Sequence, residues 1–207
     1  MTSIDSATTP QHVWDALKEG NARFAADNPQ RPNTDTQRRS LLVEGQDPRV
    51  VVLSCSDSRV PAELVFDLGL GDAFVIRTAG QVLDNAVLAS VEFAVENLGA
   101  SLLVVMGHES CGAVKATAGV LGGADVPQGY QRTIVEQVAL STKLAQRAGS
   151  AESADVEREH VVQIVELLRA RSPKLQEKLA DGSMGIVGLR YLLGDGKVEE
   201  IVLDGVA

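Results

Sequence analysis

The stretch that decides the fold is Ser101-Leu-Leu-Val-Val-Met106, which runs directly into Gly107-His-Glu-Ser-Cys-Gly112. Short apolar runs that are rich in β-branched residues and bounded by polar ones are typical of strands buried on both faces. Two further runs have this character, Arg49-Val-Val-Val-Leu-Ser54 and Ala73-Phe-Val-Ile76. These three runs predict three buried strands.

Helical patterns separate and follow the predicted strands. Residues 84–98 place apolar side chains on one face and stop before Gly99, a residue suited to a helix C-terminus. Further helices are predicted over residues 35–44, 112–120, 133–147, 153–171 and 173–180, and further strands over 184–189 and 198–203. This alternation indicates an α/β fold with a central, mostly parallel sheet flanked by helices.

The N-terminal region predicts a helical arm. Residues 11–27 carry a helical pattern, in which we assign Trp14 to packing, and Asn28-Pro29 ends it. An extended connector follows. We therefore expect a single domain over residues 1–207, with an arm over 1–33 and an α/β core over 34–207. The arm either folds back on its own domain or covers a partner subunit.

Composition excludes several classes of protein. The chain has 28 acidic and 19 basic residues, a net charge of −9 and 3% aromatic residues. This charge disfavours nucleic acid and anionic membranes, and so few aromatic residues cannot form a base-stacking platform. No apolar run approaches the roughly 18 residues that span a bilayer, and the polar first ten residues lack the pattern of a secretory signal. We expect a cytoplasmic protein whose two cysteines do not form a disulfide.

Both cysteines and one histidine fall beyond the carboxyl ends of predicted strands, where parallel sheets bind their ligands. Cys55 follows the strand 49–54, and His108 and Cys111 follow the strand 101–106. Two thiolates and one imidazole suit Zn²⁺. The sequence therefore predicts a zinc site at this edge of the sheet.

The remaining histidines are not obvious ligands. We expect His12 and His160 to face solvent on their helices, and residues 155–160 to form a solvated helix face. Asp57, two residues after Cys55, is then the candidate fourth ligand. Arg59 offers it another partner, because a guanidinium binds a carboxylate through two parallel hydrogen bonds and would hold it off the metal.

The number of ligands leaves the kind of site open. A catalytic zinc site has three protein ligands and an open position, whereas a structural site is closed by a fourth ligand. Asp57 as a permanent ligand would make a structural zinc protein. Two kinds of thiol chemistry also fit these residues: a redox protein that uses Cys55 and Cys111, and a cysteine nucleophile with His108 as its base.

Cys55-Ser-Asp-Ser-Arg59, about fifty residues before His108-Glu-Ser-Cys111-Gly112, resembles the paired motifs of the β-class carbonic anhydrases. The resemblance covers nearly the whole chain. It implies a zinc lyase that reversibly hydrates carbon dioxide to bicarbonate and a proton, by attack of a zinc-bound hydroxide. Close relatives that hydrolyse carbonyl sulfide or carbon disulfide are the alternative within this resemblance.

Carried over to this chain, the resemblance implies one Zn²⁺ per chain on Cys55, His108 and Cys111. Asp57 joins these ligands only in a closed state of the site. Otherwise Asp57 and Arg59 form the catalytic pair. Two thiolates cancel the charge of the ion, so we expect the pKa of the zinc-bound water to lie above the roughly 7 of a three-histidine zinc site.

The same resemblance implies the residues that bind the substrate. Gln46 would reach the substrate across a dimer interface, and the backbone N–H of Gly112 would face it. Phe74, Ala79 and Phe93 would line an apolar pocket for carbon dioxide. The implied assembly is a homodimer or a homotetramer made of two dimers, with the N-terminal arm over the partner subunit.

One departure from the family concerns regulation. Some members bind bicarbonate at a second, inhibitory site that uses a tryptophan three residues before the first zinc cysteine. This chain has Val52 there, while Arg77 and Tyr191 match the other two residues of that site. We therefore expect bicarbonate regulation in that form to be lost.

Overall fold

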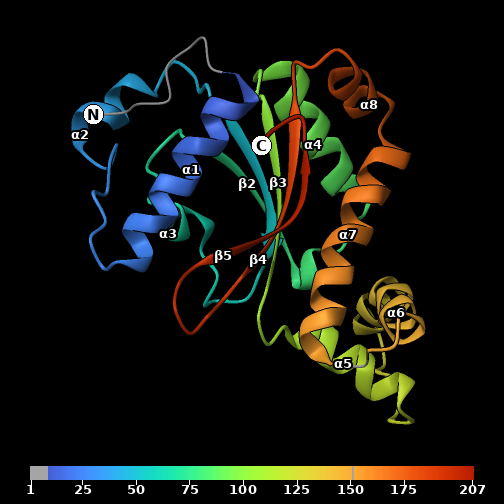
Figure 1. Cartoon of the computed structure of the whole chain (residues 1–207). Helices are drawn as coiled ribbons and strands as arrows, with labels where there is room; N and C mark the ends of the chain where they lie inside the picture. The colour runs from blue at the N-terminus through green and yellow to red at the C-terminus, as the bar shows by residue number, and fades with distance from the viewer. Residues whose placement is uncertain (1–8, 151) are drawn as a thin grey trace.

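A five-stranded sheet lies at the centre of the computed structural model, which describes residues 9–150 and 152–207 (Figure 1). The strands are β1 (Val50–Cys55), β2 (Ala73–Thr78), β3 (Leu102–His108), β4 (Gly185–Tyr191) and β5 (Val198–Asp204). Their order is β2-β1-β3-β4-β5; the first four run parallel and β5 runs antiparallel to β4. The predicted α/β class with a mostly parallel sheet is confirmed.

Helices precede, connect and flank these strands. The helices are α1 (Pro10–Ala25), α2 (Thr36–Leu41), α3 (Ala62–Val65), η1 (Ala79–Gln81), α4 (Asn85–Asn97), α5 (Gly112–Leu121), α6 (Gln131–Arg147), α7 (Ser153–Arg171) and α8 (Pro173–Ala180). The sequence pattern predicted most of them within a few residues. It did not predict α3 and η1, because helices of three or four residues are too short to show a period. No helix in the described part of the chain is long and apolar enough to cross a membrane.

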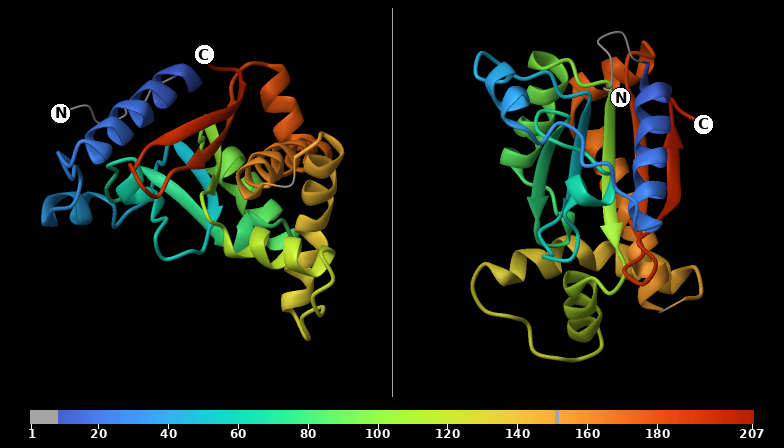
Figure 2. Two further views of the ribbon diagram at one scale, coloured as in Figure 1. Left: turned by 60° about the horizontal axis from the view of Figure 1, so that its bottom comes forward. Right: turned by 90° about the vertical axis from the view of Figure 1, so that its left-hand side faces the viewer.

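The three interior strands, β1, β3 and β4, are buried along their whole length, because helices cover both faces of the sheet (Figures 1 and 2). Val51 and Leu53 of β1 belong to the core cluster that includes α4, α7 and α8. Val50 and Val52 belong to the opposite cluster, which includes α1. Each face of the sheet therefore has its own hydrophobic core.

Helix α1 packs against the sheet of its own chain. Trp14 is fully buried in the cluster on that face, which confirms its assignment to packing. The side-chain amide of Asn21 donates hydrogen bonds to the carbonyl oxygens of Val65 (3.1 Å) and Gly196 (2.8 Å). These contacts hold the helix from two directions.

Helix α7 corrects two predictions. His12 is exposed, as expected, but His160 is fully buried and Glu157 is 2% exposed. The segment 155–160 is therefore not a solvated face. The reason is that α7 packs on the sheet and also against α5 and α6, which lie beyond the carboxyl ends of the strands (Figure 2). The charged residues of one helix do not show, from sequence alone, that other helices will cover them.

Candidate metal centre

The cysteines and His108 converge at the carboxyl ends of two neighbouring strands. Cys55 is the last residue of β1, His108 is the last residue of β3, and Cys111 is the N-cap of α5. Because β1 and β3 pair directly, the ligand atoms of the three residues all lie within 4.8 Å of one another. All three side chains are buried.

The protonation of His108 fits a metal ligand. Its Nδ1 lies 2.8 Å from the carbonyl oxygen of Glu109, which can only accept, so Nδ1 carries the proton. The other ring nitrogen, Nε2, is buried and has no hydrogen-bond partner among the described residues. A buried, unpaired nitrogen beside two sulfurs is a position that a zinc ion would satisfy.

The two thiols also favour a bound cation. Cys55 Sγ accepts hydrogen bonds from the backbone N–H groups of Asp57 (3.4 Å) and Gly80 (3.3 Å). The adjacent Cys111 thiol lowers the pKa of Cys55, while the neighbouring Cys55 sulfur raises the pKa of Cys111. By themselves the two sulfurs therefore share one negative charge. A divalent cation would allow both to be thiolates.

Asp57 lies beside the cluster and is held by Arg59. The guanidinium donates from Nε to Oδ1 (2.9 Å) and from Nη2 to Oδ2 (2.8 Å) of the carboxylate. These hydrogen bonds hold the pKa of Asp57 well below its usual range. Oδ2 lies 4.0 Å from His108 Nε2. The carboxylate thus points at the cluster while its strongest partner is the guanidinium.

A cavity of about 760 Å³ opens onto the metal centre. Cys55, Asp57, Ala79 and Gly112 all line it, so two of the predicted substrate-binding residues share the cavity with the cluster. Most of the remaining wall comes from α5, α6 and the segment between them, and it is mostly apolar. Such a surface suits a small uncharged molecule.

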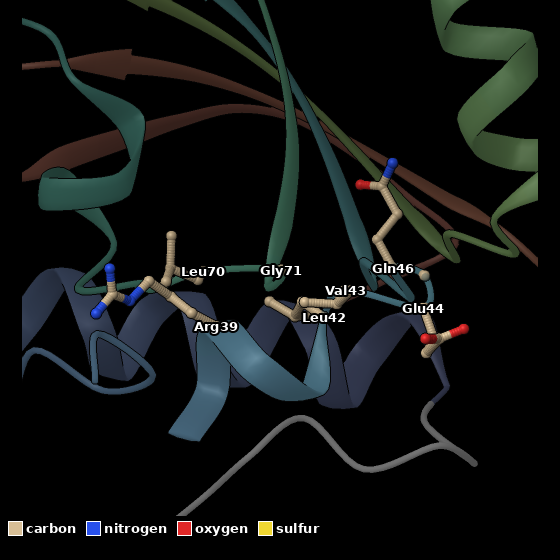
Figure 3. A pocket seen from close by; sticks show the side chains of 8 residues that line it. Arg39, Leu42, Val43, Glu44, Gln46, Leu70 and Gly71 are labelled. Carbon is tan, nitrogen blue, oxygen red and sulfur yellow. The ribbon is translucent and has the colours of Figure 1, made fainter. Parts of the chain in front are cut away.

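Gln46 does not line that cavity. It lies in a separate surface hollow of about 500 Å³ beside α2, together with Leu42 and Val43 (Figure 3). Within one chain, the structure therefore does not bring Gln46 to the metal centre. A contact between Gln46 and the site would need a second subunit.

Within one chain, the structure does not bring Phe74 and Phe93 to the cavity beside the metal centre. Phe74 pairs with Val51 at the amino ends of β1 and β2, four residues before the pair of Cys55 with Thr78. At about 3.3 Å per residue, this places Phe74 roughly 13 Å from the site. Its ring packs against Phe93 of α4, with centroids 6.3 Å apart. Phe93 is 48% exposed, and, as for Gln46, a contact between these two residues and the site would need a second subunit.

Arg77 contacts the backbone of the loop that carries Asp57. Its guanidinium donates to the carbonyl oxygens of Cys55 (3.0 Å) and Asp57 (2.7 Å). It therefore fixes the loop after β1 that carries Asp57. Val52 lies fully buried within β1, in the hydrophobic cluster that includes α1.

Sequence reasoning missed a buried polar group behind the metal centre, which consists of Glu157, His160 and Arg190. A signal was present in the sequence, since residues 157 and 160 share the face of α7 that carries Val161, Ile164 and Leu168. A search for apolar residues alone passes over polar residues on the helix face that packs against the core.

Fold and site together define a class. This is an α/β protein with a mostly parallel sheet, a Cys-His-Cys metal site at the carboxyl ends of the parallel strands and an aspartate–arginine pair beside it. A sequence profile of the carbonic anhydrase family matches residues 50–198. The chain belongs to the β-carbonic anhydrase family, whose members are zinc enzymes.

Individual relatives agree with this assignment. A carbonic anhydrase of Mycolicibacterium smegmatis is 50% identical over 192 residues, 93% of each chain. Carbonic anhydrase 2 of Mycobacterium tuberculosis is 48% identical over 190 residues, 92% of each chain. Among solved structures, the β-carbonic anhydrase CafA of Aspergillus fumigatus is 27% identical with a TM-score of 0.69, covering 90% of this chain and 89% of its own.

Proposed function

We propose that Cys55, His108 and Cys111 hold one zinc ion, and that carbon dioxide is reversibly hydrated in the cavity beside them. The observation that carries this proposal is the buried Nε2 of His108, which has no hydrogen-bond partner in residues 9–150 and 152–207 and lies beside two cysteine sulfurs. When bound there, zinc would make water acidic enough to supply hydroxide near neutral pH. The remaining roles belong to residues of this chain.

Asp57 and Arg59 orient the reacting water in this proposal. Arg59 occupies both oxygens of the Asp57 carboxylate and keeps it ionised, so that it accepts a hydrogen bond from water and never donates one. Because this hydrogen bond to Asp57 fixes the orientation of the water, a lone pair of its oxygen faces the substrate. The backbone N–H of Gly112 donates to the substrate oxygen on which negative charge develops. Ala79 and the apolar cavity wall exclude competing water.

The active unit is a homo-oligomer, a dimer or a pair of dimers. Gln46 lies outside the cavity of its own chain, and the exposed side chains of Val43 and Leu70 line its hollow with apolar surface. Exposed apolar patches of this kind are typical of subunit contacts. In the oligomer, Gln46 of one subunit donates to substrate in the next.

We also propose that residues 1–207 act as one domain, with 1–33 as its arm, and that the enzyme works in the cytosol. Both cysteines are free thiols in the structure. A reducing compartment would keep them available to zinc, whereas an oxidising one would favour a disulfide between two sulfurs this close.

Two measurements on the purified enzyme test the proposed function. Metal analysis should find one zinc per chain, which would exclude a thiol redox protein. Stopped-flow hydration of carbon dioxide should be detected and should be faster at pH 9 than at pH 7. Zinc without hydration activity would favour a structural site, and activity on carbonyl sulfide alone would favour the hydrolytic relatives.

Replacing the catalytic carboxylate tests its role directly. Asp57→Asn should lower kcat/KM for hydration by about 10²–10⁴-fold, because a positioned proton acceptor contributes that much. Zinc content should stay at one per chain. Asp125→Asn is the matched control, since Asp125 lines the same cavity away from the cluster and should keep wild-type activity. Unchanged hydration by Asp57→Asn would remove this carboxylate from the mechanism.

A further inference from the structure

Helix α7 carries two buried polar side chains that the proposed reaction does not use. Glu157 is 2% exposed and His160 is fully buried. They lie three residues apart and therefore on one face of the helix. Burying a carboxylate and an imidazole is unfavourable unless hydrogen bonds replace the lost water. Each of these side chains reaches toward one cysteine of the metal centre.

Glu157 holds the backbone of Cys111. Its Oε1 accepts from the Cys111 N–H (3.3 Å) and from Ser153 Oγ (2.9 Å), and its Oε2 accepts from Arg190 Nε (2.8 Å). Arg190 is 6% exposed and also donates to Glu199 (3.2 Å). The carboxylate is therefore held from three sides and cannot turn away from Cys111.

The peptide that Glu157 holds is under conformational strain. Ser110, the residue before Cys111, adopts a φ of 56°, which is unfavourable for a side chain larger than hydrogen. Such a conformation persists only where the surrounding contacts fix it. The hydrogen bond from Cys111 to Glu157 is one of these contacts, at the point where the chain turns from β3 into α5.

His160 acts on Cys55 through Gly80. Its Nε2 lies 2.8 Å from the carbonyl oxygen of Gly80, so Nε2 carries the proton, and Nδ1 accepts from Ser141 Oγ (2.9 Å). Gly80 in turn donates its N–H to Cys55 Sγ at 3.3 Å. The imidazole thereby fixes the residue that donates to the sulfur.

We propose that α7 braces the metal centre, with Glu157 and His160 as positioning residues for Cys111 and Cys55 that set how long zinc is retained. This inference rests on the proposed function, because it assumes zinc on these cysteines. Partners behind the ligands orient the ligand atoms, and their loss generally weakens metal binding by about 10–100-fold. One helix supplies such a partner for each thiolate.

The experiment compares pairs of variants with similar side-chain volume. Glu157→Gln keeps an oxygen that accepts from Cys111, whereas Glu157→Leu does not. His160→Gln keeps an N–H donor for the carbonyl of Gly80, whereas His160→Leu does not. The readouts are the rate of zinc release from the holoenzyme to excess chelator, and the visible absorption of enzyme loaded with Co²⁺, which reports sulfur ligation.

Each Leu variant should release zinc about 10–100-fold faster than wild type and should alter the cobalt spectrum. Each Gln variant should stay closer to wild type than its Leu partner. Val165→Ala is the control, because Val165 lies further along α7 in the hydrophobic core. It should lower Tm without changing either readout at a temperature well below its Tm.

Wild-type release rates and an unchanged cobalt spectrum in the Leu variants would overturn the inference. Release from Val165→Ala as fast as from the Leu variants would also overturn it, since general destabilisation would then suffice. Should Glu157→Leu fail to fold, the His160 pair decides by the same readouts. Wild-type enzyme without zinc would instead contradict the proposed function itself.

Discussion

At the scale of single residues, Gly80 shows how little room the metal centre leaves. It adopts a φ of 68°, and an added Cβ would lie 2.5 Å from the Cβ of Ala113 in α5. Its N–H donates to Cys55 and its carbonyl accepts from His160. Only glycine combines this backbone conformation with such close approach of α5.

Gly80→Ala should therefore lower the free energy of unfolding by more than the strain of a positive φ alone would. Gly99→Ala is the matched control, because Gly99 has a φ of 69° but open space around it. Strain at a positive φ costs about 1–2 kcal/mol, and overpacking adds about 1–3 kcal/mol at Gly80 only. Urea denaturation gives both free energies of unfolding, and equal losses would mean that the contact with Ala113 relaxes freely.

His160 should make the free energy of unfolding depend on pH. Burial lowers the pKa of His160 in the folded protein, whereas in the unfolded chain it titrates near 6.5. Below about pH 6.5 the unfolded chain then binds a proton that the folded chain does not, so stability falls as pH falls. Urea denaturation between pH 7.5 and 5.5 should show a steeper loss for wild type than for His160→Gln. Parallel curves for the two proteins would contradict this.

Several functional residues could be predicted from sequence, and others could not. Cys55 and His108 could be predicted because each lies at the end of an apolar run that reads as a strand, and the carboxyl ends of parallel strands meet at one edge of the sheet. Glu157 and His160 could not, because their burial depends on the packing of α7 against α5 and α6. Within one chain, strand register places Phe74, and Phe93 packed on it, away from the site, so their predicted role depends on a second subunit.

At the scale of elements, α1 depends on a close contact with the end of α3. A Cβ added at Gly20 would lie 2.0 Å from the carbonyl oxygen of Phe66. The following residue, Asp67, accepts hydrogen bonds from Arg23 (2.7 Å) and from the N–H groups of Gln30 and Arg31 (both 2.9 Å). Burial raises the pKa of Asp67, but these three donors outweigh it and lower the pKa overall.

Gly20→Ala should push α1 away from the sheet. Alanine favours a helix over glycine by about 1 kcal/mol, but overpacking against a backbone carbonyl costs about 1–3 kcal/mol or more, so the net effect should be destabilising. Limited proteolysis should also cut sooner in the connector after α1. Gly119→Ala in α5 is the control, because its nearest neighbour lies 4.0 Å away, and it should be neutral or stabilising. A stabilising Gly20→Ala would show that α1 adjusts without cost.

The elements themselves were largely predictable, because long periodic patterns dominate this chain. Strands β1 and β3 are bounded by polar residues, and α4 is bounded by Asp84, which caps its first turn, and by Leu98 and Gly99 at its end. The short helix η1 was hidden, since its shape follows from Gly80 and its contacts rather than from any period. It is nevertheless the element that donates to Cys55.

At the scale of the whole molecule, the site described in one chain lacks Gln46, and the proposed oligomer supplies it. Val43 is 79% exposed beside Gln46. Val43→Glu should place repelling charges at the subunit contact, lower the molar mass measured by light scattering, and lower hydration activity. Raising the protein concentration should restore both together. A variant that keeps its wild-type molar mass and activity would place the contact elsewhere.

The class of the molecule could be predicted from the alternation of strands and helices, whereas its assembly could not be derived from one chain. Right-handed crossovers and strands buried on both faces are properties of the chain itself. The position of a subunit interface depends on complementarity between two surfaces, and the periodicity of the sequence does not predict it.

The order of the metal-centre residues along the chain has a consequence for biosynthesis. The three proposed ligands lie on β1, β3 and the start of α5, all within the first 111 residues, whereas Glu157, His160 and Arg190 come later. A ribosome therefore completes the ligands before it completes their brace. Zinc captured by the nascent chain would exchange readily with cellular chelators, and it would become trapped only when α7 docks. Retention of the metal would then mark the completion of folding.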